Sequence, residues 1–353
     1  MVLSQVSSTN SNLFCFLVKP DNIYISIYES NSSDGTQELL KAFALVLAAR
    51  GVRHRIICGS EKRQWGELNS VERIQFLKGV RNKALEPLAS LDPLVRLDDA
   101  QRWQSGRTLF LNDILFDWKD AVKLLNDRTD DGHEFDMICG IDYGPVGLYD
   151  TWVIRDQCGR WVRNEWPYFR DPVAIERMRE NRPVNVATCW NGIVVLATKL
   201  IYRPELEEAS ITLDEHVHPL FKRGAMVDNP TDPSSLHSPP ASLPISFRVA
   251  LNPECNHSEC FLFSYDIHRV YPSKERPPRV AVDPLVKVAY EERWYALEKE
   301  IMDMPRVKWW LELMHTGPLW RIQLDAWRKK EFWKDGCTWF GLNIPEHCSA
   351  QIE

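Results

Sequence analysis

The sequence predicts an α/β protein whose mixed sheet is mostly parallel. Segments with alternating apolar residues, rich in β-branched and aromatic side chains, are separated by longer segments whose apolar residues recur at helical spacing. Acidic or amide residues stand at the ends of several strand-like segments. Because parallel strands present their carboxyl ends at one edge of a sheet, these polar residues are expected to face a common cleft.

The first part of the chain alternates strand and helix. The run NIYISIYES predicts a strand ending at Glu29, and the turn-rich stretch NSSDGT leads into a helix over QELLKAFALVLAAR that stops at Gly51. VRHRIIC predicts a second strand, and SVERIQFLKGVRNKALEPL a second helix that ends near Pro87. The strand RTLFL follows, with the pair Asn112-Asp113 at its end.

The later part is less regular. Helices are predicted over residues 118–126 and 172–181, with a strand FDMICGI between them and a single strand VNVATCWNGIVVLA after them. A Pro- and Ser-rich loop over residues 228–244 precedes a strand SFRVAL and a helix opening at Ser258. Beyond YPSKERPPRV the chain is predicted to be helical. We therefore expect a leader (residues 1–20), one α/β domain (21–285) and a helical, Trp-rich C-terminal extension (286–353).

Composition and charge bound the class of protein. The 353 residues are 44% hydrophobic and 26% charged, as expected of a folded globular chain. The formal net charge is -6 and the basic residues are interspersed with carboxylates, which argues against nucleic acid as a partner. The longest apolar runs, FCFLV and IVVLA, are too short for a membrane helix, and no signal-peptide pattern is present, so the compartment stays open.

Cysteine and tryptophan are the unusual residue types. Nine cysteines at irregular spacing argue against a dense disulfide framework, and the odd number leaves at least one thiol free. Cys255 and Cys260, with His257 and His268, suggest a zinc site but lack a second ligand pair, so we favour buried thiols in a reducing or mixed compartment. The tryptophans gathered from residue 294 onward indicate either packing or a sugar-stacking or membrane-surface platform.

Six blocks of sequence, taken in order, resemble fungal capsule-associated α-1,3-mannosyltransferases. They are IYISIYESNSSDGTQELL, FLKGVRNKALEPL, LFLNDILF, CGIDYGPVGLYDTWVIRDQCGRW, CWNGIVVL and SFRVALNPECNHSECFLFSYDI, and they fall within residues 21–290. The resemblance implies a GT-A-like nucleotide-sugar-binding domain that transfers mannose from GDP-mannose to an α-mannoside of a wall or capsule polysaccharide, with retention of configuration. It also implies Mn²⁺ or Mg²⁺ as cofactor and the Golgi or secretory pathway as compartment.

The sequence departs from that family at two points. Its members commonly carry an N-terminal membrane anchor that is not visible here, and the Asp-x-Asp metal signature of GT-A enzymes is replaced by Asn112-Asp113. Asp113 is therefore the expected metal ligand, and His268 is a second candidate ligand. Asn112 is expected either to hold Asp113 in position or to contact the sugar. The alternative for Asn112-Asp113 is a capping pair at a helix start.

The donor site is expected beside the first strand and the second helix. Tyr28 and Glu29, with the following loop, are candidates for holding the nucleoside, and an ordinary strand-to-helix turn is the alternative. Arg81 and Asn82 are candidates for contacting ribose or diphosphate, because a guanidinium binds phosphate through paired N–H groups. A surface arginine on a helix is the alternative for Arg81.

The acceptor site is expected in and beyond the aromatic-rich segment that follows Asp142. Tyr149 offers an apolar face for a sugar ring, and the acceptor-binding candidates are Asp150, Trp152, Arg155, Asp156, Trp190 and Asn191. A structural network between the arginine and the aspartates is the alternative. Catalysis is assigned to Asp142 and Glu259, the latter as a nucleophile, as an acceptor-binding base or only as a helix-capping residue.

A function from a different class stays open. A non-catalytic, sugar-binding or scaffolding member of a polysaccharide assembly or export machinery would keep the same fold without transferring sugar. In either case the Trp-rich C-terminus is a candidate for docking on a membrane surface or on a protein partner. Binding of a nucleotide sugar, with or without turnover, separates the two classes.

Overall fold

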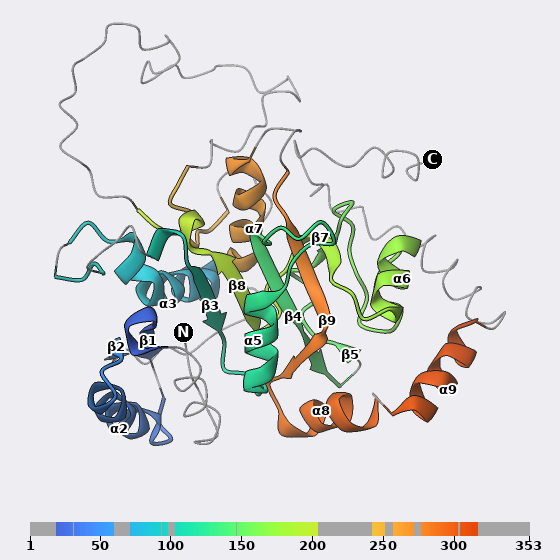
Figure 1. Cartoon of the computed structure of the whole chain (residues 1–353), viewed down its shortest axis with the longest axis horizontal. Helices are drawn as coiled ribbons and strands as arrows, with labels where there is room; N and C mark the ends of the chain where they lie inside the picture. The colour runs from blue at the N-terminus through green and yellow to red at the C-terminus, as the bar shows by residue number, and fades with distance from the viewer. Residues whose placement is uncertain are drawn as a thin grey trace, which may run out of the picture.

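Two β-sheets with helices on their faces make up the computed structural model (Figure 1). It describes residues 19–30, 32–59, 71–92, 94–97, 103–145, 147–203, 242–250, 257–271, 277–302 and 304–316. The α/β class predicted from the sequence is confirmed. The predicted leader up to residue 18, most of the Pro- and Ser-rich loop and the end of the C-terminal extension lie outside the described residues.

The larger sheet has seven strands in the order β3-β8-β4-β9-β7-β6, with β5 paired to β4. Among the described strands of this sheet, β4 and β9 alone run parallel, so the prediction of a mostly parallel sheet is wrong here. The smaller sheet is the parallel pair of β1 and β2. The strands are Tyr24–Ser30 (β1), Arg53–Gly59 (β2), Arg107–Leu111 (β3), Met137–Gly144 (β4), Gly147–Leu148 (β5), Arg155–Asp156 (β6), Val184–Thr188 (β7), Ile193–Ala197 (β8) and Val280–Ala289 (β9).

A chain reversal between β7 and β8 explains part of the antiparallel character. The segment VNVATCWNGIVVLA, predicted as one strand, contains two strands separated by a turn at Trp190, Asn191 and Gly192. Gly192 has a φ of +77°, and a side chain there would come within 2.9 Å of Ile114. Glycine suits this position because other residues rarely adopt a positive φ. The turn places Asn191 at the end of the sheet that carries the candidate site.

Strand β9 lies where the sequence predicts helix. Pro284 falls inside it, and proline is uncommon in central strands because it cannot donate a backbone hydrogen bond. The strand accommodates Pro284 because its pairing register with β4 shifts at this point. Gly140 of β4 lies against the shifted part, where a side chain would come within 2.8 Å of the carbonyl oxygen of Val286. The predicted domain boundary after residue 285 falls within this strand, and the domain division itself stays a prediction.

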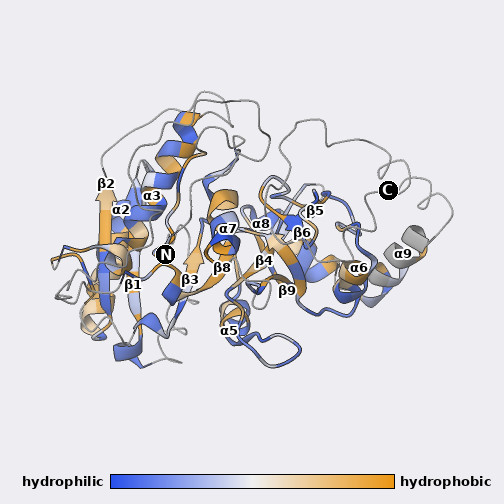
Figure 2. Ribbon diagram, turned by 90° about the horizontal axis from the view of Figure 1, so that it is seen from above, coloured by the Kyte–Doolittle hydropathy of each residue, from blue (hydrophilic) through white to orange (hydrophobic). Residues whose placement is uncertain are grey.

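Helices cover both faces of the larger sheet (Figures 1 and 2). Helix α5 packs on one face and α7 on the other, while α2 and α3 pack on the smaller sheet and α3 also contacts α7. The helices predicted before residue 181 are present, with small differences at their ends. The helices are Thr36–Ala49 (α2), Val71–Ala89 (α3), Trp118–Asn126 (α5), Pro172–Arg179 (α6), Glu259–Val270 (α7), Glu292–Ala296 (α8) and Pro305–Thr316 (α9), with a π-helical turn at Leu297–Ile301.

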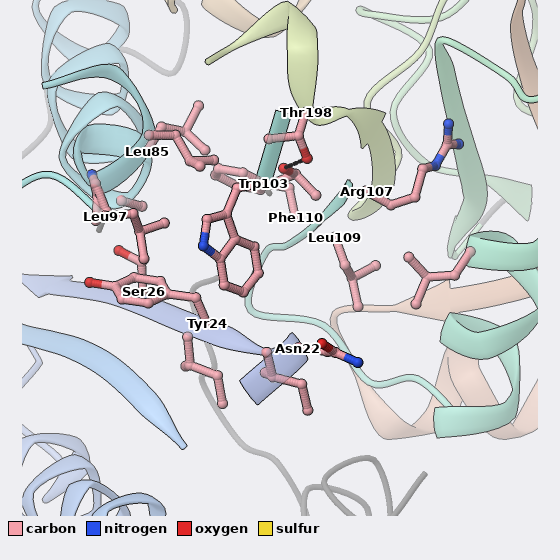
Figure 3. A pocket seen from close by; sticks show the side chains of 17 residues that line it. Asn22, Tyr24, Ser26, Leu85, Leu97, Trp103, Arg107, Leu109, Phe110 and Thr198 are labelled. Atoms are coloured by element: carbon pink, nitrogen blue, oxygen red, sulfur yellow. Dashed lines mark hydrogen bonds between the residues drawn. The ribbon is translucent and has the colours of Figure 1, made fainter. Parts of the chain in front are cut away.

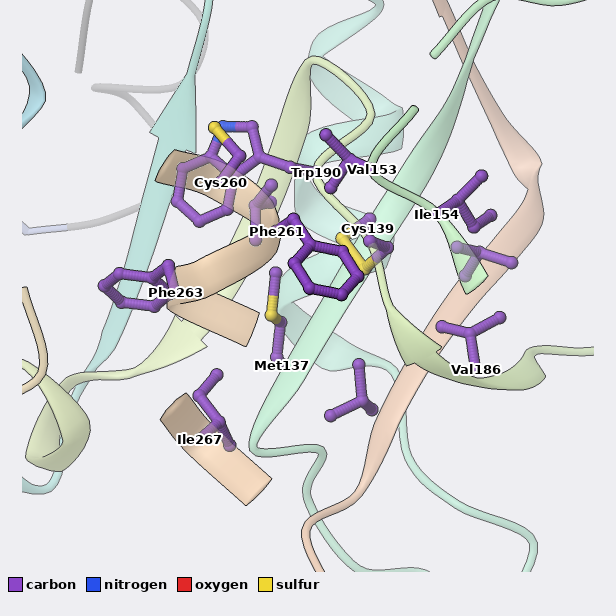
Figure 4. Close-up of a cluster of buried hydrophobic side chains, with 14 of the residues drawn as sticks. Met137, Cys139, Val153, Ile154, Val186, Trp190, Cys260, Phe261, Phe263 and Ile267 are labelled. Atoms are coloured by element: carbon purple, nitrogen blue, oxygen red, sulfur yellow. A yellow bond between two sulfur atoms is a disulfide. The ribbon is translucent and has the colours of Figure 1, made fainter. Parts of the chain in front are cut away.

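The central strands bury both of their faces. Along β4, Met137 and Cys139 belong to the hydrophobic cluster under α7, whereas Ile138 belongs to the cluster under α5, as the two-residue period of a strand requires. Figure 4 shows the first cluster, in which Phe261 of α7 lies beside Cys139 of the strand. Burial on both faces fixes the position of β4, which carries Asp142 near its end.

The segment SFRVAL, predicted as a strand, is not part of either sheet in its described residues 246–250. Phe247 inserts instead among the rings of Phe110, Trp190 and Phe263. Its backbone N–H donates to Oδ1 of Asn82, and its carbonyl oxygen accepts from Nδ2 of Asn82, both at 2.9 Å. A side chain on α3 thus satisfies the backbone groups that a strand partner would otherwise satisfy.

A disulfide joins Cys139 of β4 to Cys189, directly after β7, across 50 residues of sequence (Figure 4). Cys158 is also disulfide-bonded, whereas Cys58 and Cys260 are free among the described cysteines. The expectation of reduced thiols is therefore wrong for Cys139, Cys158 and Cys189. The expectation of at least one free thiol is confirmed.

Replacing both Cys139 and Cys189 by alanine is expected to lower the free energy of unfolding by about 2 to 4 kcal/mol, because the crosslink restricts the unfolded chain over a long loop. Urea unfolding followed by far-UV circular dichroism measures the change. The control is Cys58→Ala, which removes a free, half-buried thiol and is expected to leave the midpoint nearly unchanged. Equal midpoints for the double variant and the wild-type protein would show that the crosslink contributes no stability.

The described part of the C-terminal extension after β9 is helical up to Thr316, as predicted. Trp309 and Trp310 on α9 are 65% and 53% exposed, so these two tryptophans do not pack into a core. No helix in the described part of the chain combines the length and the apolar character that crossing a bilayer requires.

Candidate functional site

Three acids lie close together beside the end of β4: Asp142, Asp150 and Glu259, termed here the carboxylate cluster. Asp142 is the sixth residue of β4, Asp150 follows β5, and Glu259 is the first residue of α7. The charge of Asp150 acts on Asp142, and the charge of Glu259 acts on Asp150. Neighbouring carboxylates repel one another, so a cluster of them needs a proton, a cation or a ligand to offset the negative charge.

Asp142 is fixed by hydrogen bonds from two neighbours. Its Oδ1 accepts from Nδ2 of Asn191 at 2.7 Å and from the backbone N–H of Asp150 at 3.3 Å. The side chains of Asp142 and Asn191 are fully buried, and Oδ2 of Asp142 and Oδ1 of Asn191 have no hydrogen-bond partner among the described residues. Buried acceptors without a donor are uncommon in native proteins, and a bound hydroxyl group would satisfy them.

Burial shifts the titration of both aspartates toward neutral pH. It raises the pKa of Asp142 to about 7, with a further rise from the charge of Asp150, against the hydrogen bonds from Asn191 and Asp150. It raises the pKa of Asp150 to about 6, against the hydrogen bond from the N–H of Val153 and the charge of Arg81. Carboxyl groups that titrate near neutrality are suited to exchange protons with a substrate hydroxyl.

Arg81 of α3 and Glu259 of α7 form a buried ion pair. The guanidinium carbon of Arg81 also lies 5.7 Å from the ring centroid of Phe247. Glu259 does not cap α7, because the hydroxyl of Ser258 accepts the N–H groups of Cys260 and Phe261. The ion pair fixes Glu259, which favours a role in binding and charge placement over attack as a free nucleophile.

The pair Asn112-Asp113 follows β3 and lies next to the turn that carries Asn191. The backbone N–H of Asn112 donates to the carbonyl of Gly192 at 2.9 Å, and its Nδ2 donates to the hydroxyl of Tyr290 at 3.0 Å. Tyr290 directly follows β9 and is a site residue that the sequence pattern does not indicate. The alternating run VKVAY is the signal for a strand that leads to Tyr290, in a part of the chain that is predicted to be helical.

Asp113 is exposed and does not cap a helix. The cap of α5 is Asp117, whose Oδ1 accepts the N–H of Lys119 at 2.9 Å. The side chain of Asp113 reaches solvent, but the protein around its carboxyl group partly desolvates it and raises its pKa, and the positive charge of Arg81 opposes the rise. Asp113 therefore offers an accessible carboxylate close to the buried ion pair.

Asp113 fits a divalent cation that a substrate helps to bind. Among the described residues, no group of three or more His, Cys, Asp or Glu side chains is arranged to hold a metal ion. Mg²⁺ and similar hard cations are commonly bound by one or two carboxylates together with substrate phosphates and water. The residues present thus suit a cation shared with a diphosphate rather than a closed metal site made by the protein alone.

The structure places His268 away from Asp113. His268 lies near the opposite end of α7 from Glu259, roughly 13 Å further along the helix axis. Its Nε2–H donates to the carbonyl of Ala187 at 2.7 Å, and burial lowers the pKa of His268 to about 4 despite this hydrogen bond. This geometry favours a structural histidine. Of the suggested zinc ligands, Cys255 lies outside the described residues and Cys260 is a buried free thiol.

The remaining donor-site candidates lie at two places. Tyr28 and Glu29 are near the carboxyl end of β1, where Oε1 of Glu29 accepts the N–H of Ser32 at 2.8 Å and its Oε2 has no partner among the described residues. Tyr28 is half-buried and packs against the larger core cluster. Both polar atoms of the Asn82 side chain form hydrogen bonds with the backbone of Phe247, so Asn82 has a structural role.

Four predicted acceptor residues have contacts that support the fold. Arg155 donates to backbone carbonyls of its own loop and stacks on Trp161 at 3.5 Å, and burial lowers the pKa of Arg155 to about 9. Asp156 accepts from the backbone N–H and from the guanidinium of Arg160. Trp190 packs among core aromatic rings. Trp152 is half-buried, and its carbonyl accepts from Arg155.

Asp150 and Asn191 are the acceptor candidates that hydrogen-bond Asp142 among the described residues. The alternative of a network between Arg155 and Asp156 or Asp150 is wrong for the described residues, because Asp156 takes Arg160 as its partner and Arg155 donates to backbone carbonyls. The site that emerges therefore contains the carboxylate cluster, Asn191, the ion-paired Arg81, and Asn112-Asp113 with Tyr290.

A separate cavity of about 260 Å³ lies between β1 and β3 (Figure 3). Its lining is mostly apolar, with the indole of Trp103 between the two strands and the hydrogen-bonded hydroxyls of Thr108 and Thr198 at one side. It adjoins the first residues of β1, whereas Glu29 lies near the other end of that strand. None of the predicted site residues lines it.

Comparison with known proteins gives one finding. A family model described as cryptococcal mannosyltransferase 1 matches residues 2–266, which is most of the chain. No curated protein and no solved structure matches. The match includes the carboxylate cluster, Asn191, Arg81 and Asn112-Asp113, and it ends before Tyr290.

Proposed function

The chain belongs to the cryptococcal mannosyltransferase 1 family, and from this we propose that it transfers mannose from GDP-mannose to a hydroxyl of an α-mannoside, forming an α-1,3 linkage with retention of configuration. The observation that carries the proposal is the convergence of Asp113, Arg81 and the carboxylate cluster at one end of the larger sheet. The acceptor would belong to a cell-wall or capsule polysaccharide, and Mn²⁺ or Mg²⁺ would be the cofactor.

On the donor side, the bond between C1 of mannose and the β-phosphate oxygen breaks, and GDP departs with added negative charge. A divalent cation held by Asp113 and the diphosphate would stabilise that charge. Arg81 adds a positive charge close to Asp113, and its charge acts on the carboxyl of Asp113. Asn112 is held by Tyr290 and Gly192, so it supports the position of Asp113.

On the acceptor side, a bond forms between C1 and the acceptor oxygen, whose proton passes to the departing phosphate or to a carboxylate. The unpaired Oδ2 of Asp142 and Oδ1 of Asn191 are suited to accept hydrogen bonds from sugar hydroxyls. The negative charge of Asp150 and Glu259 favours the positive charge that develops at C1 during transfer. The Cys139–Cys189 disulfide agrees with a secretory compartment, since such bonds persist in oxidising surroundings.

Titration calorimetry with GDP and GDP-mannose tests the donor site. Binding to the wild-type protein is expected with Mn²⁺ and is expected to be lost with EDTA. Asp113→Asn keeps the size of the side chain but removes its charge, so it should lose the metal-dependent part of binding, about tenfold or more in Kd. The control is Asp131→Asn in an exposed loop, expected to bind as the wild type does.

A transfer assay with α-1,3-mannobiose as acceptor and linkage analysis of the product tests the reaction. Absence of GDP and GDP-mannose binding under every condition would overturn the proposal. Metal-dependent binding of GDP-mannose without transfer or hydrolysis would instead assign the chain to the second class, a non-catalytic sugar-binding member of a polysaccharide assembly machinery.

A further inference from the structure

Two tyrosines with exposed rings lie beside the carboxylate cluster, and the reaction as proposed assigns no ligand contact to either ring. The ring centroids of Tyr149 and Tyr290 are 5.5 Å apart with an interplanar angle of 54°. Tyr149 is 56% exposed and Tyr290 37% exposed. Tyrosine rings usually gain free energy from burial, so adjacent exposed rings mark a surface that a ligand covers.

The backbone and its neighbours hold both rings in place. The N–H of Tyr149 donates to the carbonyl of Asp142 at 2.9 Å. Gly144 leaves room for the ring, because a side chain there would lie 2.9 Å from Cδ2 of Tyr149. The hydroxyl of Tyr290 accepts the hydrogen bond from Asn112. The two rings therefore stand between the segment that carries Asp113 and the strand that carries Asp142.

Acidic and amide groups border the pair. Asp150 follows Tyr149 in the chain, and the charges of Asp142, Asp113 and Asp150 all act on the hydroxyl of Tyr290. The acceptor atoms Oδ2 of Asp142 and Oδ1 of Asn191 have no partner among the described residues. An apolar ring face next to unpaired acceptors is the arrangement that a sugar needs, since a hexose presents C–H groups on one face and hydroxyl donors at its edge.

We propose that Tyr149 and Tyr290 form the stacking platform for the acceptor hexose, and that Tyr290 also positions Asn112 through its hydroxyl. This inference rests on the proposed function for the identity of the acceptor as a mannoside. The other planar ligand of such an enzyme is the guanine base. The rings border Asp142 and Asp150, whereas the nucleoside is expected at Glu29 on the smaller sheet, so the sugar is the better occupant.

Replacing Tyr149 tests whether its ring binds the acceptor, as distinct from an effect on turnover or on donor binding. Tyr149→Ala is expected to raise the acceptor KM about tenfold or more, with kcat at saturating acceptor and the Kd for GDP-mannose within about twofold of wild type. Tyr149→Phe keeps the ring and should retain the wild-type KM. Gly144→Ala displaces the ring without removing it and should raise the acceptor KM in the same direction. The control is Leu94→Ala, which removes an exposed apolar side chain outside the site and is expected to leave the acceptor KM unchanged.

Tyr290→Phe tests the positioning role, because it keeps the ring and removes the hydrogen bond with Asn112. We expect kcat to fall about threefold to tenfold with little change in acceptor KM. Tyr290→Ala should combine this loss with a raised KM. An unchanged acceptor KM in Tyr149→Ala would overturn the platform. Weaker GDP binding in Tyr149→Ala would overturn it as well, since it would assign the ring to the guanine base.

A binding experiment keeps this test separate from that of the proposed function. Calorimetry with α-1,3-mannobiose alone measures the platform without any transfer. If the wild-type protein binds no GDP-mannose but binds mannobiose, and Tyr149→Ala abolishes that binding, the platform stands although the transferase proposal fails. If the wild-type protein binds GDP-mannose but Tyr149→Ala binds mannobiose as tightly as wild type, the platform fails alone.

Discussion

Replacing Arg81 by methionine is expected to lower the free energy of unfolding by about 3 to 5 kcal/mol, because it leaves the buried carboxylate of Glu259 without its partner. Methionine preserves most of the apolar stem that lies beside Phe247, so the change isolates the loss of charge. The pair joins α3 to α7 across 178 residues of sequence, so loss of the pair should also loosen the contact between the two helices.

The double variant Arg81→Met/Glu259→Gln provides the internal control. Removing both charges together should recover most of the lost stability, while transfer activity stays low because two site residues are missing. A surface comparison is Arg182→Met, which breaks exposed ion pairs with Asp130 and Glu180 and is expected to leave the urea midpoint unchanged. If Arg81→Met unfolds at the same urea concentration as the wild-type protein, the carboxylate of Glu259 does not need Arg81 to compensate its buried charge.

Asp142→Asn is expected to stabilise the protein at alkaline pH and to abolish most of its activity. The raised pKa of Asp142, about 7, means that the folded protein binds this proton more tightly than the unfolded chain does. Wild-type stability should therefore fall as pH rises from about 4 to about 7, and the asparagine variant should lack this part of the fall. Above pH 7 the variant is expected to be more stable by on the order of a few kcal/mol.

Urea unfolding at several pH values between 4 and 8 measures the effect. The side-chain oxygen that Asp142→Asn retains can still accept the hydrogen bonds from Asn191 and Asp150, so the fold should persist, while transfer is expected to fall roughly a hundredfold or more. The control is Asp130→Asn, because its two arginine neighbours lower the pKa of Asp130 to about 2 and its titration lies outside the window. Parallel pH profiles for wild type and Asp142→Asn would contradict the assignment.

The elements that the sequence predicts correctly are those whose pattern is local. β1, α2, β2, α3, β3 and α5 each carry a periodicity or cap within their own residues, such as the turn-rich loop before α2 and Asp117 at the start of α5. The position of Asn112-Asp113 directly after a strand is predicted correctly for the same reason. Periodicity within a segment does not determine which strands pair, or in which direction.

Two of the errors arise where distant residues decide the structure. Pro284 argues against a strand, yet β9 forms because Gly140 on β4 makes room for a register shift. Cys139 and Cys189 are far apart in sequence, and no spacing rule pairs them. The reversal between β7 and β8 explains part of the antiparallel character, and this error is local, because Asn191-Gly192 is a turn signal that the prediction of a single strand passes over.

The candidate site also combines features that the local sequence indicates with features that only the fold decides. Residue type and position indicate Asp142, Asp150 and Asn191 as candidates, and the fold brings them into contact. The same signals indicate Arg155 and Asp156, but the hydrogen bonds of these two residues hold their own loop together. A buried acid in a candidate site and a buried acid in a turn look alike in sequence: Asp142 is distinguished by its distant partner Asn191, whereas Asp156 takes Arg160 of its own loop.

The position of β9 constrains how the chain reaches its folded state. It is the last strand to be synthesised among those described, yet it lies between β4 and β7 in the middle of the larger sheet. A nascent chain that ends at residue 266, where the family match ends, lacks β9, so the edges of β4 and β7 that β9 pairs with in the described structure lack that partner. Completion of the sheet, and with it the arrival of Tyr290, must therefore wait until synthesis has passed β9. A shortened chain intended for expression needs to extend beyond β9.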